Sequence, residues 1–406
     1  MSHLRTLIAD RIRAEGPISV AEFMRLSLYH PAYGYYARAS RRTGRAGDFF
    51  TSVDVGPVFG ELLARQFAEM WEVLRSSHAS TGSDEPEARS PKPEARFFDL
   101  VEAGAGSGRL ARDVLDALAR HHPELYSRVR LHLVEIAAAA RAVQIETLGP
   151  HASTLVFSSE SLPKSVTGVI FANELLDALP THAVVMTEEG LREVFIDVKS
   201  ADGNDSEFVE SEGGPSTPEL ERYLAAAGAQ LEPGWRAEIN LEAPAWIRQA
   251  ARSLQRGFLM LLDYGHEAAA LYSASHSAGT LTTFQHHTSG SRAAMLQDPG
   301  EHDITAHVDL TTVTRTAEAV GLVTLGRLDQ TYFLLGLGLA EMLDGEPFDG
   351  AQGRPFDIDQ TALKKRLGLK TLMLPGGLGS TLKVLIFGKD VGRPKLKGLS
   401  YKIRLT

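Results

Sequence analysis

The sequence of 406 residues contains no cysteine, which limits the chemistry available to the protein. Without a thiol, the chain forms no disulfide and has neither a thiolate nucleophile nor a zinc site with cysteine ligands. Long apolar runs are also missing, because the longest, 257–262, is far shorter than the ~20 residues that cross a bilayer. Residues 1–13 mix acidic, basic and apolar types, unlike a signal peptide or a transit segment. We therefore expect a cytoplasmic protein without membrane insertion.

The chain also lacks an excess of basic residues. It has 42 Lys and Arg against 51 Asp and Glu, a formal net charge of −9. A surface that binds nucleic acid needs clustered positive charge to neutralise phosphates, so no nucleic-acid partner is expected. With 43% hydrophobic and 23% charged residues, the composition is that of an ordinary globular protein.

The apolar pattern predicts an α/β protein whose sheet is interrupted by an insertion. From residue 97, short apolar runs alternate with helical segments, which is typical of β-α-β units and a parallel sheet. The expected parts are an N-terminal helical region with a lid (1–75), a flexible linker (76–96), the first part of the core (97–180), an inserted hairpin with helices (181–256), and the rest of the core with a C-terminal helical insertion (257–406). Within the insertion, an acidic flexible loop is expected over 200–218.

A glycine-rich turn follows the first predicted strand of this core. Glu102 precedes it, and Gly104, Gly106 and Gly108 occupy alternate positions. A loop that opens a helix approaches a ligand closely only where side chains are absent. The dinucleotide motif G-x-G-x-x-G would need a third glycine at Arg109, so the spacing disfavours it. A plain tight turn remains the structural alternative.

A second acid, Glu135, ends the next predicted strand. It is placed to accept hydrogen bonds from both hydroxyls of a ribose, a task that needs two acceptor oxygens. A dehydrogenase would use such an acid too, and a solvated strand end is the plain alternative. The turn itself, from Glu102 to Gly108, resembles the first motif of class I methyltransferases, which use S-adenosylmethionine. In that family, the acid at Glu102 lies near the cationic methionine end of the cofactor.

Separated segments extend the resemblance to the MidA-like methyltransferases, whose mitochondrial member is a protein arginine methyltransferase needed for respiratory complex I assembly. The matching segments are 33–36, 47–51, 59–61, 134–136, 173–180, 262–265, 279–281 and 303–309, with the glycine turn. The resemblance implies a class I methyltransferase (Rossmann-like) sheet with N-terminal helices and inserted substrate-side elements. It also implies S-adenosylmethionine as cofactor and an arginine side chain of a partner protein as acceptor, with a respiratory-complex subunit as one such partner.

Candidate catalytic acids follow the strand predicted over 168–172. Carboxylates orient a guanidinium because its planar donor fork pairs with them, so Glu174 and Asp177 are the catalytic candidates. Acids that merely favour a helix N-terminus are the alternative. Asn173 is expected to contact the cofactor, by resemblance to class I methyltransferases.

The segment before the first long helix supplies further candidates. Asp48 and Thr51 are expected to lie in a lid over the cofactor, although a polar turn explains them equally simply. The chain departs from the family pattern after Thr51, and whether Asp54 replaces the family's glutamate stays open. The tyrosines at 29, 33, 35 and 36 could contact adenine or a cation, but core packing is favoured.

No metal site is predicted. His302, His307 and Asp309 match no established ligand spacing. Two other functions stay open at this point: an assembly or binding protein that retains the methyltransferase fold, and a nicotinamide-dependent oxidoreductase.

Overall fold

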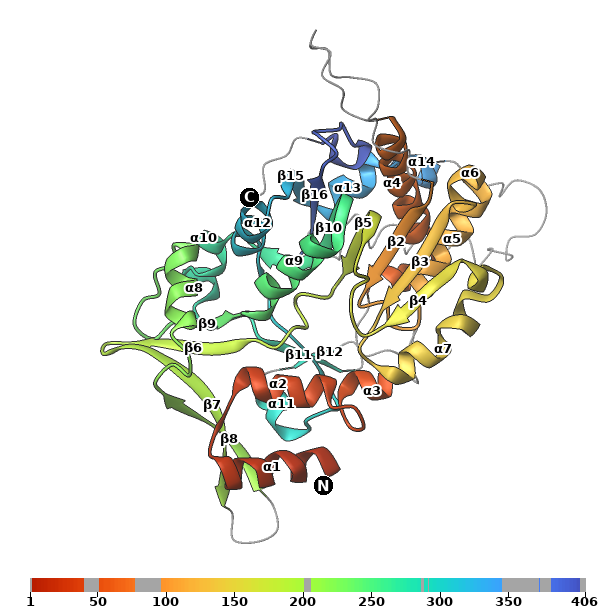
Figure 1. Ribbon diagram of the computed structural model, residues 1–406. Helices are drawn as coiled ribbons and strands as arrows, with labels where there is room; N and C mark the ends of the chain where they lie inside the picture. The colour runs from red at the N-terminus through yellow and green to blue at the C-terminus, as the bar shows by residue number, and fades with distance from the viewer. Residues whose placement is uncertain are drawn as a thin grey trace, which may run out of the picture.

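A mixed eight-stranded sheet runs through the centre of the molecule (Figure 1). The computed structural model describes residues 2–39, 51–76, 96–200, 206–285, 288–290, 292–344, 372 and 381–401. In spatial order the strands are β15 (Val323–Asp329), β16 (Leu382–Lys389), β10 (Leu254–His266), β5 (Val166–Asn173), β2 (Phe98–Ala103), β3 (Val129–Val134) and β4 (Leu155–Ser159), and β14 (Val308–Asp309) pairs with the end of β10. From β10 to β4 neighbouring strands are parallel, whereas β16 is antiparallel to both of its neighbours.

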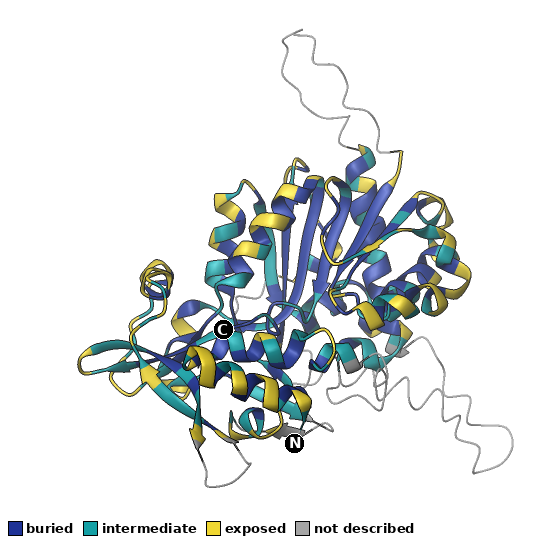
Figure 2. Ribbon diagram, turned by 60° about the horizontal axis from the view of Figure 1, so that its bottom comes forward, coloured by how far each residue is buried: buried dark blue, intermediate teal, exposed yellow. Residues whose placement is uncertain are grey.

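Helices cover both faces of this sheet, as the alternation of apolar side chains requires. Leu100 contributes to a core with α4 (Pro57–Ser76), α5 (Arg109–His121) and α13 (Gln330–Gly336). Val101, its neighbour, contributes to the opposite core with α9 (Glu242–Ser253) and α12 (Leu310–Ala319). The strands are therefore buried between two helical layers (Figure 2).

A second sheet, formed mostly by the insertion, packs against the N-terminal helices (Figure 1). Its strands are β1 (Ile18–Ser19), β7 (Gly190–Ser200), β6 (His182–Thr187) and β9 (Arg236–Ile239) in that order, with β8 (Ser206–Gly213) paired to β7. The helices α1 (His3–Glu15) and α2 (Val20–Tyr29) begin at the capping side chains of Ser2 and Ser19. A smaller sheet has the order β12 (Thr288–Gly290), β11 (Thr282–Gln285), β13 (Asp303–Thr305).

Short helices connect these layers. The remaining α-helices are α3 (Tyr35–Ala39), α6 (Pro123–Tyr126), α7 (Ala138–Leu148), α8 (Glu219–Ala227), α10 (Ala268–Leu271), α11 (Arg292–Gln297) and α14 (Leu339–Asp344). The 3-10 helices are η1 (Ser52–Val55), η2 (Gly149–Thr154), η3 (Ala274–His276) and η4 (Lys397–Leu399). Among the helices of the described residues, none is long and apolar enough to cross a membrane.

The predicted α/β fold is confirmed, but the flexible loop expected over 200–218 is partly wrong. Within that range, β8 (Ser206–Gly213) forms a continuous antiparallel ladder with β7. Phe208 is 4% exposed and joins the core of the N-terminal helices, so one buried aromatic residue and main-chain pairing order an otherwise acidic segment. Most of the predicted linker, residues 77–95, lies outside the described part of the chain.

Candidate active site

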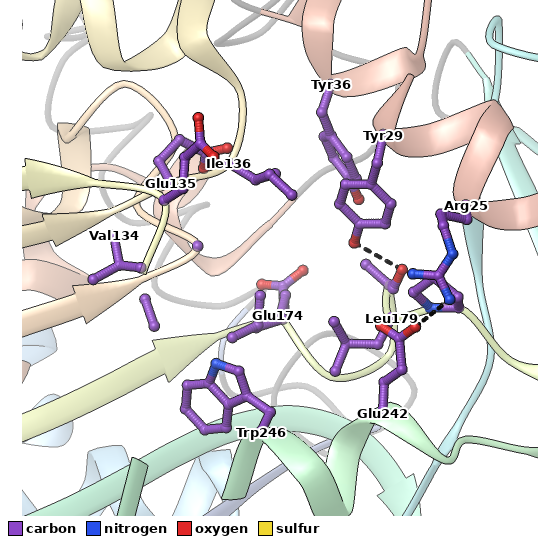
Figure 3. A pocket seen from close by; sticks show the side chains of 16 residues that line it. Arg25, Tyr29, Tyr36, Val134, Glu135, Ile136, Glu174, Leu179, Glu242 and Trp246 are labelled. Atoms are coloured by element: carbon purple, nitrogen blue, oxygen red, sulfur yellow. Dashed lines mark hydrogen bonds and ion pairs between the residues drawn. The ribbon is translucent and has the colours of Figure 1, made fainter. Parts of the chain in front are cut away.

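A cavity of about 440 Å³ opens at the carboxyl ends of β2, β3 and β5 (Figure 3). Ligands of open α/β sheets bind at this edge, and the volume suits a small molecule. Its lining combines the ends of these strands with α2, α3 and α9, through Arg25, Tyr29, Tyr36, Ala103, Gly104, Val134, Glu135, Ile136, Glu160, Glu174, Leu175, Ala178, Leu179, Pro180, Glu242 and Trp246.

The glycine turn borders this cavity between β2 and α5. Gly104, Gly106 and Gly108 have φ angles of 71°, 51° and 83°, a region that favours glycine. A Cβ added at Gly104 or Gly108 would lie 3.1 Å from a methyl carbon of Leu175 or Leu133, whereas one at Gly106 would meet nothing within 4 Å. Gly106 is therefore where the bare backbone faces open space.

Glu135 lies at the wall of the cavity and holds the turn in place. Its Oε2 accepts a hydrogen bond from the Gly106 amide at 2.9 Å, and its Oε1 accepts one from the Ala137 amide at 2.7 Å. Each oxygen retains a second lone pair for a ligand hydroxyl. Burial raises the pKa of this carboxyl above its usual value. The glycine turn and Glu135 therefore lie together at one side of the cavity.

Glu102 lies beneath the turn and does not line the cavity. Its Oε2 accepts a hydrogen bond from the Ala111 amide in the first turn of α5, at 3.1 Å. Burial is the main cause that raises the pKa of Glu102 to about 8. The direct contact of this side chain in the structure is therefore with the helix N-terminus.

Glu174 projects into the cavity from the end of β5 (Figure 3). Its φ angle is 53°, so a non-glycine residue adopts the left-handed region at this position. Its Oε1 accepts hydrogen bonds from Asn173 Nδ2 at 3.0 Å and from the Ser52 amide at 3.4 Å. Within the described residues, the buried Oε2 has no hydrogen-bond partner. Burial raises the pKa of Glu174 to about 8.

Asp177, the second catalytic candidate, is buried beside the cavity rather than in its lining. Burial, together with the neighbouring carboxylate of Asp263 on β10, raises the pKa of Asp177 well above its usual value. Asp263 in turn accepts from the amides of Leu175 at 3.1 Å and Leu176 at 2.7 Å. Asp263 was not among the predicted site residues, although it directly follows an apolar run of the sequence. Asp263 therefore holds the loop that presents Glu174.

The four tyrosines separate into two roles. Tyr29 and Tyr36 line the cavity with ring centroids 5.3 Å apart, whereas Tyr33 and Tyr35 are not part of its lining. The Tyr29 hydroxyl donates to the Ala178 carbonyl oxygen at 2.9 Å, and the Tyr36 hydroxyl donates to Asp303 Oδ1 at 2.9 Å. Burial, with nearby acids, raises the pKa of both phenols, so they remain neutral.

Arg25 and Glu242 also form part of the cavity wall, and neither residue was predicted from the sequence. Arg25 Nη2 lies 2.5 Å from Glu242 Oε1, although 217 residues separate them in the chain. Trp246, one turn further along α9, lines the same side (Figure 3). No local motif marks these residues, because the contact depends on how α2 and α9 pack.

The lid candidates differ in what the structure shows. Asp48 lies outside the described residues. The Thr51 amide and hydroxyl donate to Asp54 Oδ2 at 3.0 and 3.1 Å, which caps η1. Thr51 is not part of the cavity lining, but the next residue, Ser52, contacts Glu174 through its amide. The start of this segment therefore reaches the candidate catalytic acid.

The family described as "Putative S-adenosyl-L-methionine-dependent methyltransferase" matches residues 62–328, well over half of the chain. The chain belongs to this methyltransferase family. Its glycine turn, Glu135 and Glu174 all lie in the matched range, and the nicotinamide alternative is thereby removed.

Curated relatives of the methyltransferase cover most of its length. Protein arginine methyltransferase NDUFAF7, mitochondrial, of Mus musculus is 29% identical over 367 residues, which are 83% of this chain and 76% of the mouse protein. Its homolog in Drosophila melanogaster is 30% identical over 356 residues, 80% of this chain and 74% of the fly protein. Both are named as mitochondrial, and this finding contradicts the cytoplasmic location expected from the sequence.

A solved structure agrees over nearly the whole methyltransferase. A Burkholderia thailandensis protein bound to S-adenosyl-homocysteine has a TM-score of 0.81 and 26% identity, covering 98% of this chain and 94% of that one. The fold is therefore that of a class I methyltransferase, and the cofactor is S-adenosylmethionine. The residues present fit this cofactor, because Gly106 leaves the space beside the turn open and Glu135 offers two acceptor oxygens at the cavity wall.

Proposed function

We propose that this methyltransferase transfers a methyl group to an arginine side chain of a partner protein. The observation that carries the proposal is Glu174, a buried carboxyl group whose Oε2 lacks a hydrogen-bond partner among the described residues and which lines the cavity. A guanidinium group, with its planar fork of N–H donors, would satisfy this oxygen. The names of the mouse and fly relatives point to the same acceptor.

The surroundings of Glu174 support a cationic acceptor. The nearby carboxylates of Asp263 and Asp54 raise the pKa of Glu174, and those of Asp263 and Glu174 raise the pKa of Asp177, so the acids of this region repel one another. A cation entering the cavity would relieve that repulsion and favour the ionised form of Glu174. The faces of Tyr29 and Tyr36 would pack beside the cation, while their neutral hydroxyls keep the wall rigid.

The chain's residues would act mainly by alignment and by excluding water. Bound S-adenosylmethionine supplies an electrophilic methyl group. Glu174 would accept hydrogen bonds from one edge of the guanidinium and so direct a nitrogen lone pair toward the cofactor side of the cavity. Asp177 would serve as a positioning residue, because it acts through Asp263 on the loop that carries Glu174.

The cofactor would lie along the glycine turn. We assign the ribose hydroxyls to Glu135 and close backbone contact to Gly104, Gly106 and Gly108. Glu102 would shape the turn from below through α5, and Asn173, which already holds Glu174, would lie beside the methyl donor. Asp48 and Thr51 are proposed to cover the cofactor from the segment before η1.

The test is transfer of labelled methyl groups to proteins. Cell extract is incubated with labelled S-adenosylmethionine and the enzyme. The extract is enriched in respiratory membranes, because family resemblance makes a respiratory-complex subunit the first acceptor to examine. We expect label in methylarginine after protein hydrolysis. Glu174→Gln should abolish the labelling, whereas Glu188→Gln, an exposed acid in the β6–β7 turn, should preserve it. Label found only on a small molecule, or on lysine, would contradict the arginine proposal.

A further inference from the structure

Three histidines from separate segments converge beyond the end of β10. His266 is the last residue of β10, His276 ends η3, and His307 lies between β13 and β14. One ring nitrogen of each lies within 4.8 Å of the corresponding nitrogens of the other two. Their ring centroids are 4.7, 5.1 and 6.1 Å apart. This group of His266, His276 and His307 is called the histidine triad below.

Main-chain contacts hold the three segments independently of the imidazole rings. His266 pairs with Asp309 in the parallel bridge between β10 and β14, which places His307 beside it. The His307 amide donates to Thr280 Oγ1 at 3.1 Å, and the Gly279 amide donates to the His276 carbonyl at 2.8 Å. The triad is therefore preorganised by the backbone rather than by contacts among the rings themselves.

The tautomer of His276 is determined by its surroundings. Its Nδ1 lies 2.9 Å from the Ala270 carbonyl oxygen, which can only accept, so Nδ1 carries the proton and Nε2 keeps a free lone pair. A backbone carbonyl on the second ring nitrogen is the usual partner of a metal-binding histidine. Because Nδ1 contacts the Ala270 carbonyl oxygen, Nε2 lies on the opposite side of the ring and its lone pair can bind a ligand.

His307 adds an unsatisfied atom. Its Nδ1 is buried and, within the described residues, has no hydrogen-bond partner. Such atoms are rare in folded proteins because burial without a partner costs free energy, so each requires an explanation.

The charged side chains beside the triad are paired with one another. Glu267, next to His266, forms an ion pair with Arg327 at 2.6 Å, and Lys383 pairs with Asp329 at 2.5 Å. Asp309, which the sequence analysis grouped with His302 and His307, accepts from the Thr312 amide at 3.0 Å and caps α12. These acids are therefore engaged with other partners, and the three rings lie beside one another at interplanar angles of 45°, 42° and 74°.

We propose that His266, His276 and His307 bind one divalent transition-metal ion of the zinc type, with water completing a tetrahedral site. Imidazole nitrogens at 2.0–2.1 Å from zinc lie about 3.4 Å apart, so binding would draw the rings slightly closer than in the described structure. Three histidine ligands with one open position suit zinc, and cobalt or nickel as substitutes. The ion would satisfy His307 and tie together β10, η3 and the β13–β14 connection.

The site would brace one wall of the methyltransferase cavity. His266 follows Asp263 by three residues, or about 10 Å of extended strand. Ala306, the residue before His307, donates its amide to the Asp177 carbonyl at 3.0 Å. A metal at the triad would thus stabilise the loop that presents Glu174 without touching the reacting groups.

The experiment measures zinc bound to the full chain, purified without a polyhistidine tag. After removal of metal with a chelator and dialysis against zinc, elemental analysis should find about one zinc per chain, and zinc should raise Tm. His276→Ala should lose this zinc or bind it at least about tenfold more weakly. His121→Ala, an exposed histidine at the end of α5, is the matched control and should bind normally.

If His276→Ala is unstable, a second triad variant and a cobalt spectrum test the same site. His266→Asn should lose zinc in the same way, and cobalt bound to the wild-type chain should show the absorption of a tetrahedral nitrogen-ligated ion. The proposal would be overturned if the wild-type protein bound no zinc. It would also be overturned if both triad variants bound zinc as well as the wild type does.

Discussion

Arg109 Nη2 lies 2.6 Å from Asp54 Oδ1, so the first residue of α5 is tied to the 3-10 helix η1. Asp54 uses its other oxygen to accept from the Thr51 amide and hydroxyl. Arg109 stands where the dinucleotide motif would have its third glycine, and here its side chain connects η1 to the end of the glycine turn. Asp54 therefore has a structural role at the position where the chain departs from its family's usual pattern.

This ion pair should contribute measurable coupling to stability. Asp54 and Arg109 side chains are 10% and 27% exposed, so the pair is only partly screened by solvent. In a double-mutant cycle with Asp54→Asn and Arg109→Gln, we expect a coupling free energy of about 1 kcal/mol. Urea unfolding of the four proteins measures it. Strictly additive effects of the two substitutions would show that the contact is not formed in solution.

Gly106→Val should abolish cofactor binding. The φ angle of 51° strains any β-branched residue, and the new side chain would enter the open space beside the turn. Calorimetry with S-adenosylhomocysteine should show affinity weakened at least about 100-fold. Gly228→Val is the matched control, since Gly228 has a φ angle of 73° and an equally open Cβ position at the end of α8. Equal affinity in wild type and Gly106→Val would remove the turn from the cofactor site.

Glu174→Gln should lower turnover while leaving cofactor affinity nearly unchanged. The amide keeps the size of the side chain but loses the charge that pairs with a guanidinium. We expect kcat to fall about 100-fold or more, with cofactor Kd within about threefold of wild type. Steady-state kinetics and calorimetry measure the two quantities on the same preparation. A large loss of cofactor affinity with normal kcat would instead place Glu174 in the cofactor site.

Acceptor binding should improve as pH rises through the pKa of Glu174. This pKa is raised to about 8, so much of the carboxyl is protonated at pH 7 and cannot pair with a cation. KM for an arginine-containing acceptor should therefore decrease between pH 6.5 and 8.5. In Glu174→Gln the dependence should be absent, because glutamine does not titrate. A KM that is flat with pH in the wild type would argue against a guanidinium partner for this group.

Stability should fall as pH rises from about 5 to 8, partly because of Glu102. Its folded pKa of about 8 lies above the usual value of 4.5, so the folded chain binds a proton that the unfolded chain has lost in this window. The stabilisation is complete below the unfolded pKa and is lost as pH rises through the folded one. Glu102→Gln should flatten the slope of the unfolding free energy by about 1 kcal/mol per pH unit. Parallel pH profiles from urea unfolding would contradict this.

Local patterns predicted much of the fold. The apolar runs at 97–101, 131–134, 168–172 and 258–262 overlap the strands β2, β3, β5 and β10, and the hairpin of β6 and β7 is present. These elements are encoded by spacing along a short stretch, which is why they can be recognised without knowledge of distant contacts. The ladder between β7 and β8 was missed because its apolar signal is weak and its order comes from main-chain pairing and one buried phenylalanine.

The sequence by itself indicated a ligand-binding turn from Glu102 to Gly108, because glycines at alternate positions permit a left-handed backbone and close approach of a ligand, and resemblance to class I methyltransferases added the expected cofactor. Only the tertiary structure placed Glu174 in the cavity and Asp177 against Asp263, and it separated Tyr29 and Tyr36 from Tyr33 and Tyr35. It also brought together the histidine triad from three separate elements. Contacts of this kind depend on how helices and strands pack. The pattern of residues within one segment does not show which side chains of another segment will contact it.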